Sequence, residues 1–362
     1  MNLLLLYGGR SGEHEISLIS SRFILANLDP EKYRVYPVWI DHEGSWYYVP
    51  LETALKAADK LPPGNIPCRL IQENSGAVFQ SGNEKVSVDF VFPGLHGPFG
   101  EDGKLQGYLE TLGTAYAGSG VLGSSLSMDK IAARNVLKSL EIPQVKYLGL
   151  LKKEYEKDPE VWAKKIENEL PYPIFVKPAN LGSSVGVSKT RNRQELEKGM
   201  KEAFLYDSRL ILEEGKTIRE CETAIIGNAY SESITTVGEI KVNADFYSYE
   251  AKYLDPEGSE VKIPANLRPE QIEEAKQIAL AAYRGLCCAG YARADLFYEA
   301  ETERFYFNEI NTLPGLTPVS MFPMLWKDAG LSGPEIMDRI IQAGLEMHRE
   351  RSSLKYNYSA QS

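Results

Sequence analysis

Cysteine and histidine are scarce in this chain of 362 residues, with four of each. The cysteines, at positions 68, 221, 287 and 288, lack the ligand spacing of a zinc site. Cys287 and Cys288 are adjacent within a helical pattern, which favours a reduced interior over a disulfide framework. We therefore expect a cytoplasmic protein.

The chain also lacks basic runs and long apolar segments. Lysine and arginine are scattered and the net charge is −10, so the electrostatic signature of a nucleic-acid-binding protein is missing. Residues 3–6 are four leucines, but no basic residue precedes them and Tyr7-Gly8-Gly9 follows at once, unlike a signal peptide or a membrane span. We expect this run to be a buried strand, and neither nucleic acid nor membrane as a partner.

The remaining composition is that of a globular protein, with 43% hydrophobic and 25% charged residues. At about 100 to 200 residues per domain, the length predicts two or three domains. In the first third, apolar runs alternate with helical patterns, which is typical of an open parallel α/β sheet with ligands at its strand ends. The predicted elements are strands at 3–7, 33–40 and 86–92, helices at 15–28 and 105–112, and an irregular surface excursion after residues 61–67.

A second unit begins near Met128 and has an α+β pattern, and from residue 210 onward the sequence is rich in strands. We predict domains at residues 1–127, 128–212 and 213–362. The helices expected in the last two are 129–140, 158–170, 193–204, 269–286, 320–327 and 333–347, with strands at 144–151 and 174–177.

Two neighbouring segments carry the strongest chemical signal. Tyr291-Ala-Arg-Ala-Asp295 and Asn308-Glu-Ile-Asn311 read as adjacent strands, so Arg293 with Asp295, and Glu309 with Asn311, share a face. Three oxygen ligands suit Mg²⁺ held together with nucleotide phosphates, and the guanidinium suits a developing oxyanion. The pattern predicts a magnesium-nucleotide site.

A loop of small residues, 178–186, follows the strand at 174–177 and could wrap phosphate oxygens beside Lys177, although a plain flexible loop is the alternative. It also contains Gly182-x-Ser184-x-Gly186, the pattern of a hydrolase nucleophile. Because the only histidine after Ser184 is His348, a serine hydrolase is disfavoured.

Three further segments have both a structural and a functional interpretation. Glu15 begins a helix, where it stabilises the helix dipole or awaits a substrate ammonium. His96 lies in a glycine-rich loop after a strand, as a structural or a ligand-binding side chain. Lys252-Tyr253 precedes a turn-like segment and is either a surface pair or part of a flap that closes over a nucleotide.

Taken in order, these motifs resemble those of the ATP-grasp ligases, and among them the D-alanine:D-alanine ligase family. The two signatures are His96-Gly-x-x-Gly-Glu-Asp-Gly-x-Leu-Gln-Gly107, and Gly290-x-Ala-Arg-Ala-Asp295 with Glu309-Ile-Asn-Thr-Leu-Pro-Gly315. Phe307 stands where the family usually has Leu or Ile, which affects packing only. Supporting matches are Gly8-Gly-x-Ser-x-Glu-x-Glu-Ile-Ser17, Ser127-Met-Asp-Lys130, Val176-Lys-Pro178, Gly182-Ser-Ser-Val-Gly186 and Glu250-Ala-Lys-Tyr253.

The resemblance implies an ATP-grasp fold and the ATP-dependent joining of two D-alanines through an acyl phosphate, for peptidoglycan precursors. It implies two Mg²⁺ or Mn²⁺ ions and a homodimer. Tyr253 favours a dipeptide product over a D-lactate product, with D-alanyl-D-lactate or D-alanyl-D-serine synthesis as the alternative. A nucleotide-binding protein without turnover is the remaining alternative, although the retained polar residues give no sign of a dead site.

The resemblance also implies a role for each matching residue. Carried over, the ATP site comprises Lys130, Lys177, Ser183, Glu213, Glu220 and Lys252, with Glu214 or Glu222 as alternatives for Glu213 and Glu220. The metal ligands are Asp295, Glu309 and Asn311, and the D-alanine sites comprise Glu15, His96, Arg293 and Ser320. Arg293, Gly315, Ser183 and Tyr253 assist catalysis.

Overall fold

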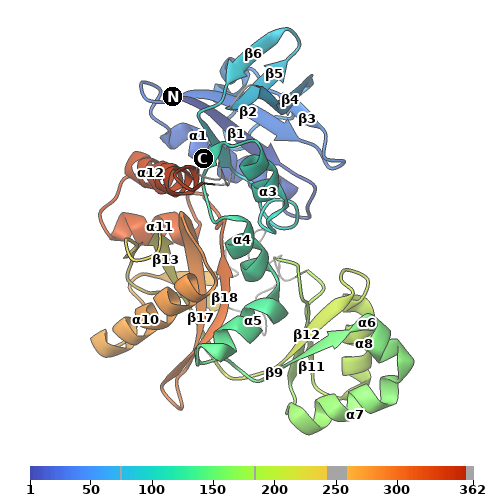
Figure 1. The fold of residues 1–362 in the computed structure, drawn as a ribbon. Helices are drawn as coiled ribbons and strands as arrows, with labels where there is room; N and C mark the ends of the chain where they lie inside the picture. The colour runs from blue at the N-terminus through green and yellow to red at the C-terminus, as the bar shows by residue number, and fades with distance from the viewer. Residues whose placement is uncertain (74–75, 183–184, 243–258, 356–362) are drawn as a thin grey trace, which may run out of the picture.

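The structure is a computed structural model that describes residues 1–73, 76–182, 185–242 and 259–355 (Figure 1). Three separate sheets follow one another along the chain. Apolar side chains of each sheet pack against helices, so each sheet has a core on at least one side. The predicted boundary between residues 212 and 213 falls inside a strand of the central sheet, and the domain limits stay a prediction.

The N-terminal sheet has eight strands in the order β6-β5-β4-β3-β2-β1-β7-β8. Its parallel part, β2-β1-β7-β8, contains the predicted leucine strand, whose residues 3–6 are fully buried. The other four strands are antiparallel additions. Strand bounds are β1 Asn2–Gly8, β2 Arg34–Ile40, β3 Trp46–Tyr48, β4 Ile66–Glu73, β5 Gly76–Ser81, β6 Glu84–Ser87, β7 Phe90–Pro93 and β8 Ala115–Tyr116.

Two sequence predictions for this region are wrong. β4, β5 and β6, at residues 66–73, 76–81 and 84–87, are antiparallel strands rather than an irregular excursion. The single strand predicted at 86–92 is two strands, because the chain leaves the edge strand β6 and enters β7 beside β1. Asp89 lies at this crossing, where its carboxylate accepts the backbone N–H of Asn2 at 2.7 Å.

The central sheet is antiparallel, in the order β11-β10-β12-β9. Helix α5 precedes it and begins after Asp129, whose carboxylate accepts the N–H of Ala132 as an N-cap. The strands are β9 Tyr147–Leu151, β10 Ile174–Pro178, β11 Ser188–Thr190 and β12 Arg209–Glu214; the helices are α5 Lys130–Ser139, α6 Lys152–Lys157, α7 Pro159–Glu169 and α8 Arg193–Ala203.

The C-terminal sheet has the order β16-β15-β13-β17-β18, and β14 pairs with β13. One face packs on α10, and the other carries polar side chains. The strands are β13 Arg219–Ile226, β14 Ser233–Ile234, β15 Gly238–Val242, β16 Ser259–Lys262, β17 Tyr291–Glu299 and β18 Arg304–Asn311; α10 is Pro269–Gly285.

The last two helices return to the N-terminal sheet. Figure 1 shows α12 beside the first strands, and residues of α11, α12, β1 and β7 share one hydrophobic core. Gly344 lets α12 approach β8, because an added Cβ would come 2.4 Å from the carbonyl oxygen of Tyr116. The remaining helices are α1 His14–Asn27, α2 Leu51–Leu55, α3 Lys104–Thr111, α4 Val121–Met128, α11 Met321–Asp328 and α12 Gly333–Ser352.

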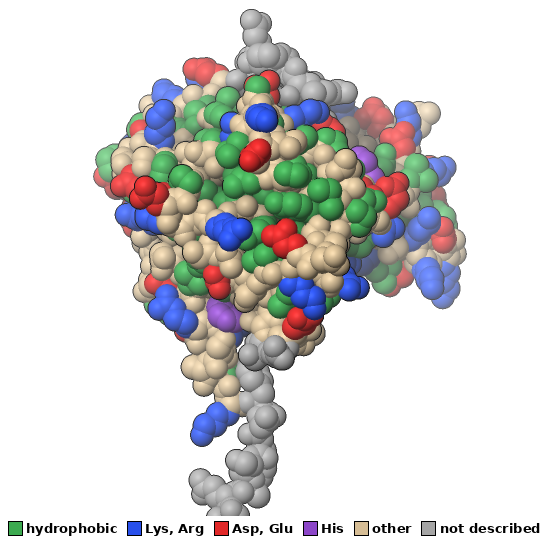
Figure 2. All heavy atoms as spheres, turned by 90° about the horizontal axis from the view of Figure 1, so that it is seen from above, with side chains coloured by type: hydrophobic (Ala, Val, Ile, Leu, Met, Phe, Trp, Pro, Cys, Tyr) green, Lys and Arg blue, Asp and Glu red, His purple; other side chains and the backbone are tan. Residues whose placement is uncertain are grey.

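The visible surface carries charges of both signs. Figure 2 shows basic and acidic side chains interspersed around a group of hydrophobic ones, with no continuous basic stripe on that face. Within the described residues, no helix has the length and apolar character needed to cross a bilayer.

Candidate active site

The polar segments singled out in the sequence are paired strands. β17 and β18 are antiparallel, with Arg293 opposite Asn311 and Asp295 opposite Glu309, so these four side chains share one face as predicted. A register shift after Asp295 leaves Asn308 unpaired, which is a β-bulge. The opposite face carries Ala292, Ala294, Leu296, Phe307 and Ile310, all buried in the core.

Arg293 is the centre of a hydrogen-bonded group on this face. Its Nε and Nη2 atoms donate to the two carboxylate oxygens of Asp295, each at 2.7 Å. Its Nε also lies 2.9 Å from Glu222 Oε2 on β13, and Asn311 Nδ2 donates to Asp295 at 3.1 Å. The guanidinium is thereby held between two carboxylates in one orientation.

Two lysines of the central unit are engaged by carboxylates. Lys130, at the start of α5, donates from Nζ to the carbonyl of Leu181 at 2.8 Å and lies 3.3 Å from Glu309 Oε2. Lys177, on β10, pairs with Glu213 Oε2 at 2.6 Å. Both ammonium groups are mostly buried, at 16% and 14% side-chain exposure, which strengthens their attraction for an anion.

Glu213 is the buried carboxylate behind these lysines. Its other oxygen is paired with Arg134 of α5, and both side chains are almost inaccessible. Burial alone would raise the pKa of Glu213, but the charges of Arg134 and Lys177 outweigh it and lower the pKa to about 2. Glu213 is therefore ionised at neutral pH and committed to two cations.

The first helix presents two glutamates, and their surroundings differ. Glu15, the predicted ammonium ligand, has a side chain that is 61% exposed and is bonded by Lys60 at 2.6 Å. Glu13 lies against the loops at Gly97 and Gly182: a Cβ added to these glycines would come 2.6 and 3.1 Å from Glu13 Oε2. Glu13, which the sequence analysis did not select, thus faces the predicted substrate loops.

His96 joins the N-terminal loop to the loop after β18. Its Nδ1 lies 3.0 Å from the carbonyl of Leu313 and its Nε2 lies 2.9 Å from Ser20 Oγ. Burial lowers the pKa of His96, so the ring is neutral, with Nδ1–H donating to the carbonyl and Nε2 accepting from the serine.

Glu101 reinforces this connection. Its carboxylate accepts the N–H of Gly97 at 2.7 Å and the N–H of Leu313 at 3.1 Å. Burial, with the neighbouring charge of Glu13, raises the pKa of Glu101 to about 8. Together with His96 it bonds both backbone groups of Leu313, two residues before the predicted catalytic Gly315.

Ser320 lies close to Gly315. Ser320 Oγ lies 3.2 Å from the N–H of Thr317 and 2.7 Å from its hydroxyl. A Cβ on Gly315 would come 2.8 Å from Ser320 Oγ, so a larger residue would displace the hydroxyl.

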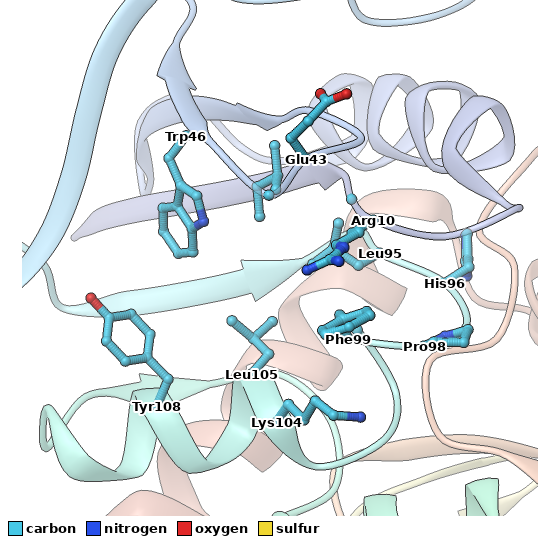
Figure 3. A pocket seen from close by; sticks show the side chains of 14 residues that line it. Arg10, Glu43, Trp46, Leu95, His96, Pro98, Phe99, Lys104, Leu105 and Tyr108 are labelled. Atoms are coloured by element: carbon cyan, nitrogen blue, oxygen red, sulfur yellow. The ribbon is translucent and has the colours of Figure 1, made fainter. Parts of the chain in front are cut away.

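A cavity of about 330 Å³ opens on the outer side of the His96 loop (Figure 3). Trp46, Phe99 and Tyr108 supply its aromatic walls, and Arg10 and Lys104 lie over the ring of Phe99. His96 lines this cavity, and no residue of β17 or β18 does.

The remaining predicted residues are Glu220, Ser183, Lys252 and Tyr253. Glu220 lies on β13, two residues before Glu222, on the polar face. Ser183, Lys252 and Tyr253 lie outside the described residues.

The oxygen donors fit divalent magnesium better than zinc or a preformed calcium cage. Within the described part of the chain, no three or more His, Cys, Asp or Glu side chains converge on one point. Asp295, Glu309 and Asn311 offer two carboxylates and one amide, and Mg²⁺ in nucleotide enzymes usually takes its other ligands from phosphates and water.

Comparison with known proteins agrees with this geometry. The family model described as D-ala D-ala ligase N-terminus matches residues 2–119, and the model described as D-ala D-ala ligase C-terminus matches residues 136–342. The chain belongs to the D-alanine–D-alanine ligase family. The family predicted from the ordered motifs is therefore confirmed.

Relatives of this family align over nearly the whole chain. Proteins named D-alanine–D-alanine ligase from Geobacillus kaustophilus and Bacillus velezensis are 43% and 39% identical, each over 98% of this chain and over 97% and 100% of their own lengths. The solved D-alanine–D-alanine ligase of Coxiella burnetii is 31% identical, with a TM-score of 0.82 over 97% of this chain and 96% of its own.

A second solved structure, the D-Ala:D-Ser ligase VanG of Enterococcus faecalis, is 32% identical, with a TM-score of 0.82 over 95% of this chain and 99% of its own. The ATP-grasp fold predicted from the sequence is confirmed by these likenesses. The same fold thus occurs in ligases with different second substrates, so the choice of second substrate depends on the side chains of the substrate site and not on the fold.

Four residues at this site were missed from the sequence. Glu13 stands within the quoted motif Gly8-Gly-x-Ser-x-Glu, and Glu101 within the His96 signature, so motif position could have found both. Glu222 was named only as an alternative for the ribose site, and only the pairing of β13 with β17 shows it beside Arg293. Arg134 carries no motif signal.

Proposed function

We propose that the protein joins two D-alanine molecules to D-alanyl-D-alanine, with ATP converted to ADP and phosphate, in the synthesis of peptidoglycan precursors. The observation that carries this proposal is the face of β17 and β18, where Arg293, Asp295, Glu309 and Asn311 lie beside Lys130. This face thus combines a cation for phosphates with oxygen ligands for Mg²⁺, as phosphoryl transfer to a carboxylate requires.

ATP would lie between the central and C-terminal sheets. Lys130 and Lys177 would contact its α- and β-phosphates, and Lys252 would contact the γ-phosphate. Glu220 is assigned to the ribose. Since both oxygens of Glu213 are engaged by Arg134 and Lys177, we assign Glu213 to holding Lys177 rather than to binding the adenine edge.

Asp295, Glu309 and Asn311 would hold two Mg²⁺ or Mn²⁺ ions. When bound, they supply positive charge that screens the carboxylate of D-alanine from the phosphate it attacks. Arg293 is bonded to Asp295 in this structure, so metal loading would free part of its guanidinium for substrate oxygens.

The reaction would proceed in two displacements. In the first, a carboxylate oxygen of the first D-alanine attacks the γ-phosphorus, and ADP leaves with the electrons of the broken P–O bond. In the second, the neutral amine of the second D-alanine attacks the acyl carbon. The tetrahedral oxyanion collapses and expels phosphate, and the amine proton is lost as the amide forms.

The chain's own residues orient these groups. Arg293 and the N–H of Gly315 would stabilise the oxyanion, and Ser320 with Arg293 would hold the carboxylate of the second D-alanine. Because His96 is neutral and both of its ring nitrogens are engaged by Leu313 and Ser20, we assign it to fixing the loops beside the first carboxylate rather than to proton transfer. Ser183 and Tyr253 would close the site.

We assign the first ammonium group to Glu13 in place of Glu15. Glu13 faces Gly97 and Gly182, whereas Glu15 is exposed and paired with Lys60. Glu13, whose charge acts on both His96 and Glu101, supplies the negative charge that an ammonium ion needs, whereas the raised pKa of Glu101 keeps that carboxyl largely protonated near neutral pH.

We infer a cytoplasmic location from the reduced cysteines, which are all free. We also infer a homodimer from the family resemblance. Gel filtration with light scattering would test the dimer, which a monomer mass at micromolar concentration would contradict.

The function is tested by measuring phosphate release with Mg-ATP and each of D-alanine, D-serine and D-lactate, with product identification. We expect D-alanine to give D-alanyl-D-alanine and Asp295→Ala to reduce turnover to background. Turnover equal to that of Asp295→Ala would refute the assignment. Preferential use of D-serine or D-lactate would show that this compound, and not D-alanine, is the second substrate.

A further inference from the structure

Arg134 is an unusual residue to find in a protein core. It lies on α5, its side chain is only 2% exposed, and it is the largest fully buried side chain among the described residues. Taking a guanidinium out of water is costly unless every donor finds a partner, and a hydrophobic residue of similar volume is often as stable. Its presence therefore calls for a role besides packing.

The guanidinium contacts two different sheets. Nη2 pairs with Glu213 on β12 of the central sheet, and Nη1 donates to the carbonyl of Phe307 on β18 of the C-terminal sheet. Phe307 precedes Glu309 by two residues, and Lys130 precedes Arg134 by four, one helical turn away. Arg134 thus lies directly behind the residues assigned to phosphates and metal.

The charges in this group set the field that reaches the nucleotide. Glu213 is ionised and lies between Arg134 and Lys177, so the three residues together carry one net positive charge. Without Arg134, Glu213 and Lys177 would form a neutral pair, and Glu213 would draw Lys177 away from a phosphate. With Arg134 present, the attraction of Glu213 is shared between two cations.

We propose that Arg134 is a positioning residue for the ATP phosphates. Through Glu213 it orients Lys177, and through the carbonyl of Phe307 it fixes the spacing between that lysine and the strand that carries Glu309. The proposal rests on the proposed function, in which Lys177 contacts a phosphate. It predicts that Arg134 affects the use of ATP more than the use of D-alanine.

Steady-state kinetics of Arg134→Met test this selectivity. We expect the KM for ATP to rise by about tenfold or more, as is typical when the partner behind a binding side chain is lost, and the KM for D-alanine to change by less than about twofold. Isothermal titration with Mg-ADP should show a similar loss of affinity. An unchanged KM for ATP, or equal rises for both substrates, would overturn the proposal.

Three further variants separate positioning from folding. Arg134→Lys keeps the charge and should recover most of the affinity for ATP. Arg134→Met combined with Glu213→Gln removes the buried carboxylate that has lost one of its two cations. It should recover thermal stability but not the KM for ATP, and recovery of both would assign Arg134 a structural role only. Arg193→Met removes an arginine from an ion-pair group of α7 and α8 and should leave both KM values unchanged.

Failure of the proposed function gives a different result from failure of this proposal. If the wild-type protein shows no D-alanine-dependent ATP turnover, the proposed function is wrong. The Mg-ADP titrations still decide the role of Arg134: weaker binding by Arg134→Met and recovery by Arg134→Lys support it, and equal affinities in all three proteins refute it.

Discussion

The two glutamates at the start of α1 allow a sharp test of how the first D-alanine is held. Glu13→Gln keeps the shape of the side chain but removes the charge that faces Gly97 and Gly182. A hydrogen bond between charged partners contributes about 1.5–3 kcal/mol, and each 1.4 kcal/mol is about tenfold. We therefore expect kcat/KM for D-alanine to fall by about 10- to 150-fold.

Glu15→Gln is the matched control, two residues away on the same helix. Its exposed carboxylate accepts a hydrogen bond from Lys60, and such surface pairs contribute about 0–1 kcal/mol. We expect kcat/KM to stay within about twofold of the wild type. The assay is coupled ADP release at saturating ATP with D-alanine varied.

Stability distinguishes a binding role from a folding role. The charge of Glu13 helps to raise the pKa of Glu101, so its removal should lower that pKa and leave thermal stability unchanged or slightly higher. A loss of activity in Glu15→Gln with full activity in Glu13→Gln would refute the assignment.

Three other predictions follow from the loops around the site. Gly315→Ala places a Cβ 2.8 Å from Ser320 Oγ and should lower kcat/KM by about 10- to 100-fold. Gly107→Ala, whose Cβ would touch only Val121 at 3.9 Å, should leave kcat/KM unchanged. Coupled ADP release measures kcat/KM for both variants. Gly290→Ala, with φ of +75° and the backbone of Gly118 within 3.1 Å, should lower the melting temperature more than Gly113→Ala, which has φ of +66° and open space. The raised pKa of Glu101 means that the folded protein binds an extra proton between about pH 4.5 and 8, so the contribution of Glu101 to stability falls as pH rises through that window. The melting temperature should therefore vary less with pH in Glu101→Gln than in the wild type. Parallel curves of melting temperature against pH would contradict this.

The regular elements were predictable because each has a local pattern. The leucine run that became β1 and the helices α1, α7, α8 and α10 follow from apolar periodicity with caps, such as Asp158 and Asn192 at the starts of α7 and α8. The strands β4 and β6 were not predictable, because neither has a clean alternation of buried and exposed residues. The alternating apolar residues Val86, Val88 and Phe90 hid the break between β6 and β7.

The polar face of β17 and β18 was predictable, but its exact construction was not. Simple alternation from Phe307 would place Glu309 on the core face, and the bulge at Asn308 is what returns Glu309 to the side of Asp295. Contacts between distant segments, such as Glu222 with Arg293 or Glu101 with Leu313, depend on tertiary packing and leave no mark on local sequence.

The acyl phosphate is the central claim, and oxygen transfer tests it most directly. D-alanine labelled with ¹⁸O in its carboxylate is incubated with the protein, Mg²⁺ and unlabelled ATP, and the released phosphate is examined by mass spectrometry. Because the attacking carboxylate oxygen becomes the bridging oxygen that leaves with phosphorus, the account predicts one ¹⁸O per phosphate for each dipeptide formed. Unlabelled phosphate from the same reaction would contradict it.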